Sequence, residues 1–246
     1  MQPPSTATDQ VYDAMRGMII QGEMPPGSRL VHRQLAKRFG TSNTPVIEAI
    51  RRLDRDGLVD CYPGWGAQVK SWTREDIETA YLAREALEGI ACRLFVSRAS
   101  ATDKYTLSEL VEQFRAAVRR GDLRESMAVD LALHLHIVKA SRMSSIHRLV
   151  ENSVIIARAI RIGTSAALPA QAQEDLAVRH DNLVSALLGD DPEAAERAGR
   201  EHIRDAMQRL LAAIAEEGAA GAEDQKGNEP LTEVGQQHAD EERTGG

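Results

Sequence analysis

Hydrophobic positions recur at helical spacing along most of this chain. In the first seventy residues the pattern predicts three helices, at about 8–21, 30–39 and 44–56. The apolar stripe of the second helix would contain Val31 and Leu35. Glycine and proline residues separate the three segments, as is typical of helix ends and turns.

Two short apolar segments, 58–62 and 67–70, follow the third helix and flank a glycine-rich turn at 63–66. Such a pair around such a turn is typical of a β-hairpin. Three helices followed by a hairpin are the elements of a winged helix-turn-helix. We therefore expect residues 1–72 to form a winged helix-turn-helix domain that binds DNA. The alternative use of such a domain is contact with another protein.

Residues 73–217 show helical periodicity and no β pattern. The periodicity predicts helices separated by short breaks, at roughly 74–98, 103–120, 123–140, 144–164, 170–188 and 192–217. Helices that are joined by short loops pack antiparallel. We expect a mainly α protein, in which a C-terminal all-α antiparallel helical bundle follows the winged domain.

The formal net charge of −7 argues against a nucleic-acid partner, because such a protein must neutralise phosphates. However, residues 216–246 carry nine acidic and two basic side chains, which account for the whole excess. This segment is rich in Gly, Glu and Gln, so we expect a disordered acidic tail over 218–246. No apolar run approaches the length of about 18 residues that a membrane span needs, and the N-terminus does not look like a signal peptide. We expect a cytoplasmic protein without a membrane partner.

A local excess of positive charge lies within the predicted helix-turn-helix. Residues 29–55 contain seven basic side chains, against two acidic ones: Arg29, Arg33, Lys37, Arg38, Arg51, Arg52 and Arg55. Such a surface can face DNA phosphates, or it can be an ordinary solvated helical face.

Polar residues interrupt the apolar stripes of three predicted helices in the bundle. Asp130 and His134 are four residues apart on one helix, so both side chains can reach one point. His180 and His202 lie on the inner faces of the last two helices, and the turn between those helices is centred midway between them. An antiparallel hairpin would place both histidines at the same height. One carboxylate and three imidazoles suit Zn²⁺ or Ni²⁺, although each histidine could instead be a hydrogen-bonded core residue.

Arg84 lies on an apolar stripe of the first bundle helix, so its guanidinium needs a partner. The partner could be a buried acid such as Glu88, one turn further along the helix. Alternatively, Arg84 could receive the carboxylate of a small effector beside the metal. Arg161 is a second candidate for effector binding.

The segment GEMPPGSRLVHRQLAKRFGTSNTPVIEAIRRLDRDGLVDCYPGWGAQV resembles the DNA-binding domain of GntR-type bacterial transcription regulators. The resemblance covers residues 10–72 and includes the turn Gly-x-x-Pro-Pro-Gly-x-x-Leu. It implies that six positions contact a double-stranded DNA operator: Arg33, Ser42, Asn43, Thr44, Ile47 and Gly66.

Two of these positions depart from the family pattern, which has arginine in place of Asn43 and of Ile47. Asparagine can pair with the N6 and N7 atoms of adenine, and isoleucine can contact a thymine methyl group. We therefore expect an operator that differs from the usual one of the family.

The bundle region resembles the all-helical FCD effector domain of the FadR-like branch of GntR regulators. The resemblance covers essentially all of 74–212 and is carried by Arg84…Glu88, by Asp130-x-x-x-His134 and by RHDNLVSALLGDDPEAAERAGREHI. It implies a divalent metal bound by Asp130, His134, His180 and His202. Small organic acids are typical effectors in this family.

Together these features predict a dimeric, ligand-responsive transcription regulator, expected to be a repressor, that senses a small carboxylate through a metal-containing domain. One alternative is a hydrolytic metalloenzyme that activates water at the same site. No separate base or nucleophile motif accompanies the site, however. The other alternative is a DNA-bound adaptor whose helical domain only mediates dimerisation.

Overall fold

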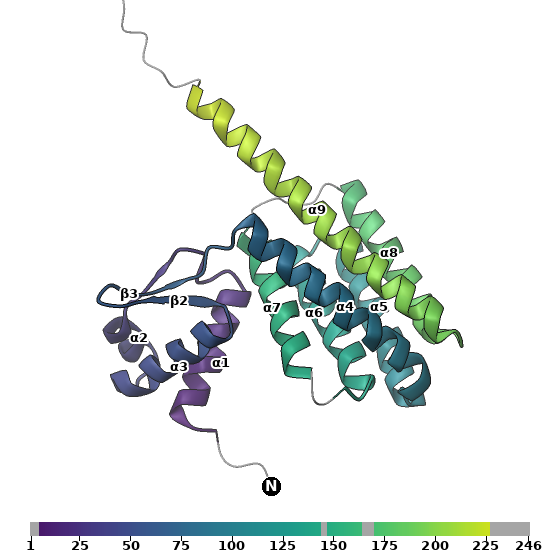
Figure 1. Ribbon diagram of the computed structural model, residues 1–246, viewed down its shortest axis with the longest axis horizontal. Coiled ribbons are helices and arrows are strands. Elements are labelled where there is room, and N and C mark those ends of the chain that lie inside the picture. Colours follow the sequence, from purple (N-terminus) through teal and green to yellow (C-terminus); the bar gives the residue numbers. More distant parts are fainter. Residues whose placement is uncertain (1–4, 144–146, 164–169, 227–246) are drawn as a thin grey trace, which may run out of the picture.

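The computed structural model describes residues 5–143, 147–163 and 170–226. A winged helix-turn-helix lies beside a helical bundle (Figure 1). The first domain contains α1 (Ala7–Ile20), β1 (Arg29–Leu30), α2 (His32–Arg38), α3 (Asn43–Arg55), β2 (Val59–Tyr62) and β3 (Gly66–Val69). The second contains α4 (Arg74–Arg98), α5 (Ala101–Arg119), α6 (Leu123–Ala140), α7 (His147–Gly163), α8 (Ala170–Leu188) and α9 (Pro192–Lys226). The predicted fold class is therefore confirmed.

A short strand, β1, was not expected from the sequence. It pairs antiparallel with β3, so the sheet has the order β1-β3-β2. Because Leu30 is in this strand, the second helix begins at His32 instead of residue 30. Val31 is the residue before that helix and is 37% exposed, so the prediction that it shares the buried stripe with Leu35 is wrong.

The bundle helices match the predicted ranges closely at their capped ends. Thr73 caps α4: its hydroxyl accepts a hydrogen bond from the backbone N–H of Asp76, and the Asp76 carboxylate accepts one from the backbone N–H of Thr73. Ser100 and Asp103 form the same reciprocal pair at α5, so that helix starts at residue 101, two residues before the predicted start.

The predicted end of the last helix is wrong. Helix α9 continues to Lys226 instead of stopping at 217, so the boundary between bundle and tail at 217/218 is not supported. Gly218 and Gly221 stand among Ala, Glu and Lys residues, whose high helix propensity offsets the cost of about 1 kcal/mol per glycine. Residues 227–246, where the rest of the expected disordered tail falls, lie outside the described residues.

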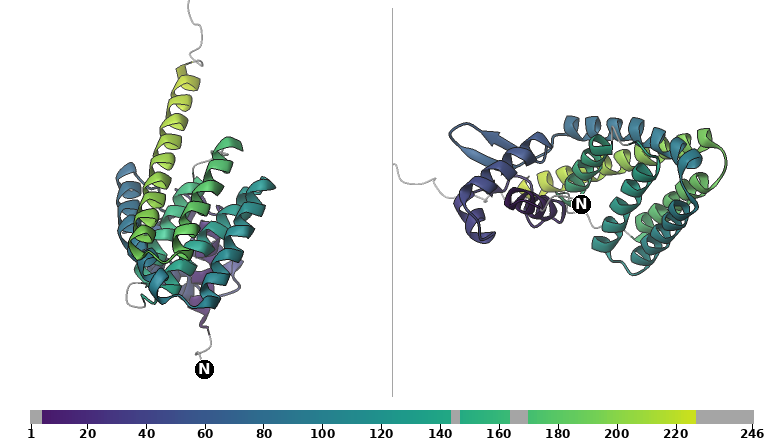
Figure 2. Two further views of the ribbon diagram at one scale, coloured as in Figure 1. Left: turned by 90° about the vertical axis from the view of Figure 1, so that its right-hand side faces the viewer. Right: turned by 90° about the horizontal axis from the view of Figure 1, so that it is seen from below.

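Helices α4 and α9 pack against each other at small residues. A Cβ atom on Gly199 would lie 2.6 Å from the Sγ atom of Cys92, so only glycine allows this approach. Helices α8 and α9 form a hairpin at one end of the bundle. Helix α9 projects beyond the bundle at the other end (Figures 1 and 2). The close approach fixes the register between the helices that carry the site described below.

The two domains share a hydrophobic core. Ile155 and Ala159 of α7 belong to the core cluster of the winged domain, and Leu131 of α6 packs against that cluster and against the core of the bundle. Polar contacts reinforce this junction: Arg16 pairs with Glu151 at 2.9 Å. The winged domain therefore packs on α6 and α7. No helix in the described part of the chain is long and apolar enough to cross a membrane.

Candidate DNA-binding surface and metal centre

The N-terminal end of α3 presents small polar side chains to solvent. Ser42, Asn43 and Thr44 are exposed, and Ile47 is half-buried one turn further on. The opposite face of α3 is buried in the core through Val46, Ala49, Ile50 and Leu53. Ser42 is the N-cap residue but its side chain makes no capping hydrogen bond, so its hydroxyl is available to a ligand. This end of the helix also carries backbone N–H groups and the positive end of the helix dipole, which favour phosphate.

The other expected DNA contacts lie on α2 and at the start of β3. Arg33 is exposed on α2. Gly66 begins β3 with a φ of 114°, a conformation that favours glycine. The predicted basic surface is smaller than the sequence suggests, because Arg52 pairs with Asp9 at 2.9 Å and stacks on the ring of Tyr12.

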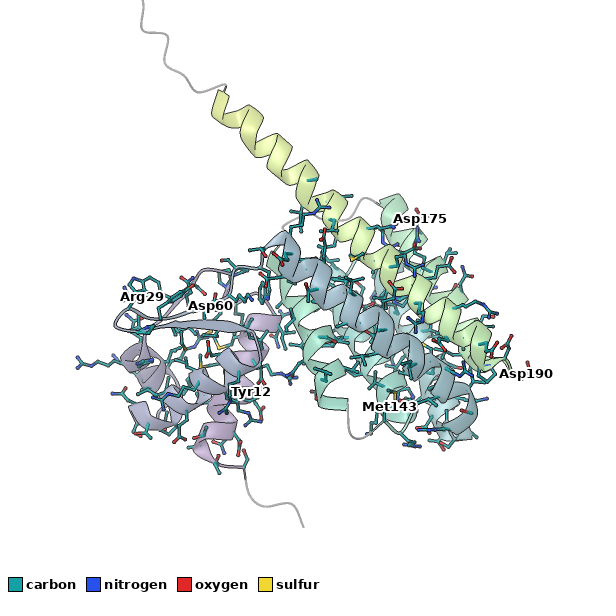
Figure 3. The ribbon with its side chains drawn as sticks, viewed as in Figure 1. Tyr12, Arg29, Asp60, Met143, Asp175 and Asp190 are labelled. Carbon is teal, nitrogen blue, oxygen red and sulfur yellow. The ribbon has the colours of Figure 1, made fainter. Side chains whose placement is uncertain are left out.

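The wing carries an aromatic and basic group that the sequence reasoning missed. Trp65 is 47% exposed at the turn, and its ring meets that of Tyr62 edge to face. Arg29 of β1 lies over Trp65, with 4.9 Å between its Cζ atom and the ring centroid, and donates a hydrogen bond to the Trp65 carbonyl. Figure 3 shows Arg29 beside the wing, on the side of the domain away from the bundle. The sequence pattern did not predict β1, the strand that brings Arg29 next to the hairpin.

Three histidines from three helices converge inside the bundle. His134 of α6, His180 of α8 and His202 of α9 are buried, and each offers a ring nitrogen within 4.8 Å of the others. The rings of His180 and His202 are 4.6 Å apart, so the two residues have the equal height expected from the α8–α9 turn. Among the described residues, this is the group whose arrangement could hold a metal ion.

Asp130 lies against the histidine cluster. Its Oδ1 atom is 2.8 Å from Nε2 of His180 and 3.7 Å from Nε2 of His134. The Nδ1 atom of His180 donates to the carbonyl of Leu176 at 2.8 Å. This contact directs Nε2 of His180 toward Asp130 and the other two histidines.

His202 supplies a neutral imidazole. Burial, reinforced by the nearby His180 and His134, lowers the pKa of His202 well below its usual value. Its Nδ1 atom is buried and has no hydrogen-bond partner among the described residues. A buried polar atom without a partner is costly, so this nitrogen is suited to receive a ligand.

Glu88 connects the histidine cluster to Arg84. One carboxylate oxygen accepts a hydrogen bond from Nε of Arg84 at 2.6 Å, and the other lies 2.6 Å from Nδ1 of His134. All three side chains are buried. Burial alone would raise the pKa of Glu88, but Arg84 and His134 outweigh that effect and lower it. The carboxylate therefore stays charged and orients the ring of His134.

The sequence indicated Glu88 only as one possible partner of Arg84. Its contact with His134 joins residues 46 positions apart in the chain, so no local pattern could reveal it. The side chain of Arg161, the other expected effector residue, lies outside the described side chains, although its backbone belongs to α7.

The buried pair predicts a large stability difference between two similar substitutions on α4. Arg84→Met leaves Glu88 buried without its main counter-charge, so we expect the free energy of unfolding to fall by about 3–5 kcal/mol. Arg74→Met is the matched control, because Arg74 also pairs with a glutamate four residues later, but in solvent. The free energy of unfolding of Arg74→Met should fall by much less. Urea denaturation measures both, and equal losses would contradict the assigned role of the buried pair.

Comparisons with known proteins identify both domains. Residues 7–69 match the family described as "Bacterial regulatory proteins, gntR family", and residues 79–205 match the family described as "FCD domain". The "Probable D-xylose utilization operon transcriptional repressor" of Paenarthrobacter nicotinovorans is 32% identical over 81% of this chain and 86% of that protein. The "HTH-type transcriptional repressor RspR" of Escherichia coli is 25% identical over 83% of this chain and 89% of that protein.

A solved structure has the same architecture. The protein "E. coli McbR/YncC" superimposes with a TM-score of 0.74 at 24% identity, over 86% of this chain and 98% of that one. At this identity the likeness shows the fold alone. The two matched domains and the identity to the Paenarthrobacter relative show that this chain belongs to the GntR family of bacterial transcription regulators and carries an FCD domain.

Proposed function

We propose that this regulator is a repressor that holds a divalent metal at its histidine cluster and senses a small organic acid there. The observation that carries the proposal is the convergence of His134, His180 and His202 with Asp130 in the interior of the bundle. The relatives described above are named as transcriptional repressors, which gives no support to the hydrolytic or adaptor alternatives.

The donor set fits Zn²⁺ or Ni²⁺. Imidazole nitrogens with one carboxylate oxygen are ligands that both ions accept. His134 and His180 each engage their Nδ1 atom in a hydrogen bond, which directs Nε2 inward. The unpartnered nitrogen of His202 marks it as the third nitrogen donor. A bound ion would supply an electrophilic centre for an effector carboxylate.

Arg84 is positioned to receive the same effector. The Nε atom of Arg84 donates its hydrogen bond to Glu88, so the terminal nitrogens of the guanidinium can donate to a carboxylate. Its Cζ atom lies 5.2 Å from the ring of Tyr81, whose hydroxyl is buried without a partner among the described residues. Arg84 and Tyr81 therefore offer donors for an acid, and Arg161 remains a further candidate.

DNA recognition in this proposal uses α3 and the wing. Two copies of the chain would place two α3 helices in successive major grooves of a two-fold operator. Arg33, Ser42, Asn43, Thr44, Ile47 and Gly66 are the proposed contacts. Effector binding must favour one arrangement of the two copies, because otherwise it could not change the DNA affinity.

Metal binding is tested by titrating the purified apo-protein with Zn²⁺ and following its melting temperature. We expect stabilisation at one ion per chain, because the ion binds only the folded site. The variant His180→Ala should lose this stabilisation. The control is His136→Ala, two residues from His134 on α6, since His136 instead contacts the Asp103 carbonyl. A full response in His180→Ala would contradict the proposed site.

DNA recognition is tested with the DNA upstream of the protein's own gene and with random DNA. If Asn43 pairs with adenine, Asn43→Ala should lose about 1–3 kcal/mol of specific binding and leave binding to random DNA unchanged. The exposed Asn182 of α8 provides the control substitution Asn182→Ala. Fluorescence anisotropy at fixed salt measures all three proteins. Equal affinity of the unmodified protein for both DNAs would overturn the proposed recognition.

A further inference from the structure

We propose that the effector of this regulator is a hydroxy acid, and that the side chain of Tyr81 binds the uncharged hydroxyl group of that effector. The inference rests on the proposed function, because it takes the metal and Arg84 as the groups that receive the effector carboxylate. It adds a specificity-determining residue and a narrower class of effector. That class is a small acid with one negative charge and a separate neutral oxygen.

Tyr81 is a buried tyrosine whose hydroxyl has no hydrogen-bond partner among the described residues. Its ring packs among apolar side chains of α4, α7 and α9, which include Ile77, Ile160 and Ile203. Ile203 directly follows His202, so this apolar group borders the histidine cluster. A buried hydroxyl without a partner destabilises a folded protein, whereas phenylalanine would fill the same space without that cost. A bound ligand can supply the partner that the described chain does not.

Tyr12 provides a contrast within the same chain. It is also buried, but its hydroxyl donates a hydrogen bond to Oδ2 of Asp56 at 2.6 Å. Buried polar groups in folded proteins are normally paired in this way. The hydroxyl of Tyr81 therefore departs from the rule that Tyr12 follows.

Tyr81 lies beside the groups that are proposed to bind the effector carboxylate. Along α4, Arg84 is one turn beyond Tyr81, and Glu88 is one further turn beyond. The Cζ atom of Arg84 is 5.2 Å from the ring of Tyr81, and Glu88 contacts His134 of the histidine cluster. Arg84 thus stands between Tyr81 and the cluster. An effector that reaches both must carry its second oxygen at a distance from its carboxylate.

The charges of the interior determine which second group the site can accept. Arg84 carries one positive charge, and Glu88 and Asp130 each carry one negative charge. Histidines that bind a metal are neutral, so a divalent ion would leave the site with one net positive charge. One carboxylate neutralises that charge. A second carboxylate would leave an uncompensated negative charge in a buried site, which is costly.

The hydroxyl of Tyr81 suits a neutral oxygen. A phenol can both donate and accept a hydrogen bond, as can an alcohol, and neither group brings a charge. The guanidinium of Arg84 instead suits a carboxylate. The two neighbouring residues therefore recognise different parts of the effector. A site that hydrogen-bonds a hydroxyl group discriminates strongly against the analogue that lacks it.

The test is isothermal titration calorimetry of the Zn²⁺-loaded full-length protein with matched acids of three, four and six carbons. Each set contains the simple acid, the terminal hydroxy acid and the dicarboxylate, such as butyrate, 4-hydroxybutyrate and succinate. We expect the hydroxy acid to bind more tightly than both counterparts in at least one set. Tyr81→Phe should weaken binding of that acid about 3- to 10-fold, because one hydrogen bond is lost, and should leave binding of the simple acid unchanged.

A second measurement needs no ligand. Because the hydroxyl of Tyr81 has no partner in the free protein, Tyr81→Phe should not lower the melting temperature. The matched control is Tyr12→Phe, which removes a hydroxyl that is bonded to Asp56 and should lower it. Tyr12→Phe should also keep the preference for the hydroxy acid. An equal loss of stability in both variants would overturn the inference, because the Tyr81 hydroxyl would then be satisfied without a ligand.

The calorimetric outcomes separate this inference from the proposed function. Tighter binding of a dicarboxylate would overturn the charge argument. Equal binding of the simple and hydroxy acids, or a preference that survives in Tyr81→Phe, would overturn the role of Tyr81. In these cases acid sensing at the metal still stands. A protein that binds Zn²⁺ and none of the acids would instead contradict the proposed acid sensing, and this inference with it.

Discussion

A single buried carboxylate, Glu88, connects Arg84 to the histidine cluster at the centre of the bundle. It accepts hydrogen bonds from Arg84 and His134, and it stays ionised because those two groups outweigh the effect of burial on its pKa. A buried charge of this kind is tolerated only with close partners. The positions of α4 and α6 are therefore tied together at this point, and the orientation of His134 follows from it.

Helix α6 connects the interior of the bundle to the DNA-binding domain. Leu131 is adjacent to Asp130 on α6 and packs against the core of the winged domain as well as that of the bundle. Ile155 and Ala159 of α7 complete that contact. On the other side of the histidine cluster, α4 carries Arg84 and Glu88 on its buried face. A change at the proposed metal and effector site can thus reach the DNA-binding domain through α6.

The sequence predicted the fold well where structure depends on local signals. The turn centred midway between His180 and His202 places these two residues at equal height, as the sequence predicts. Contacts between distant segments were not predictable. The strand β1 exists because Leu30 pairs with Ala67 of β3, and the bond from Glu88 to His134 depends on how α4 packs on α6.

We propose that Glu88 holds His134 in position for a metal ion. The most direct measurement is the affinity for Zn²⁺ of the variant Glu88→Gln, compared with the unmodified protein under identical conditions by competition with a chelator. We expect an affinity about 10–100-fold lower, because the amide removes the charge that orients and polarises the imidazole. An unchanged affinity in a variant with a native circular dichroism spectrum would contradict it.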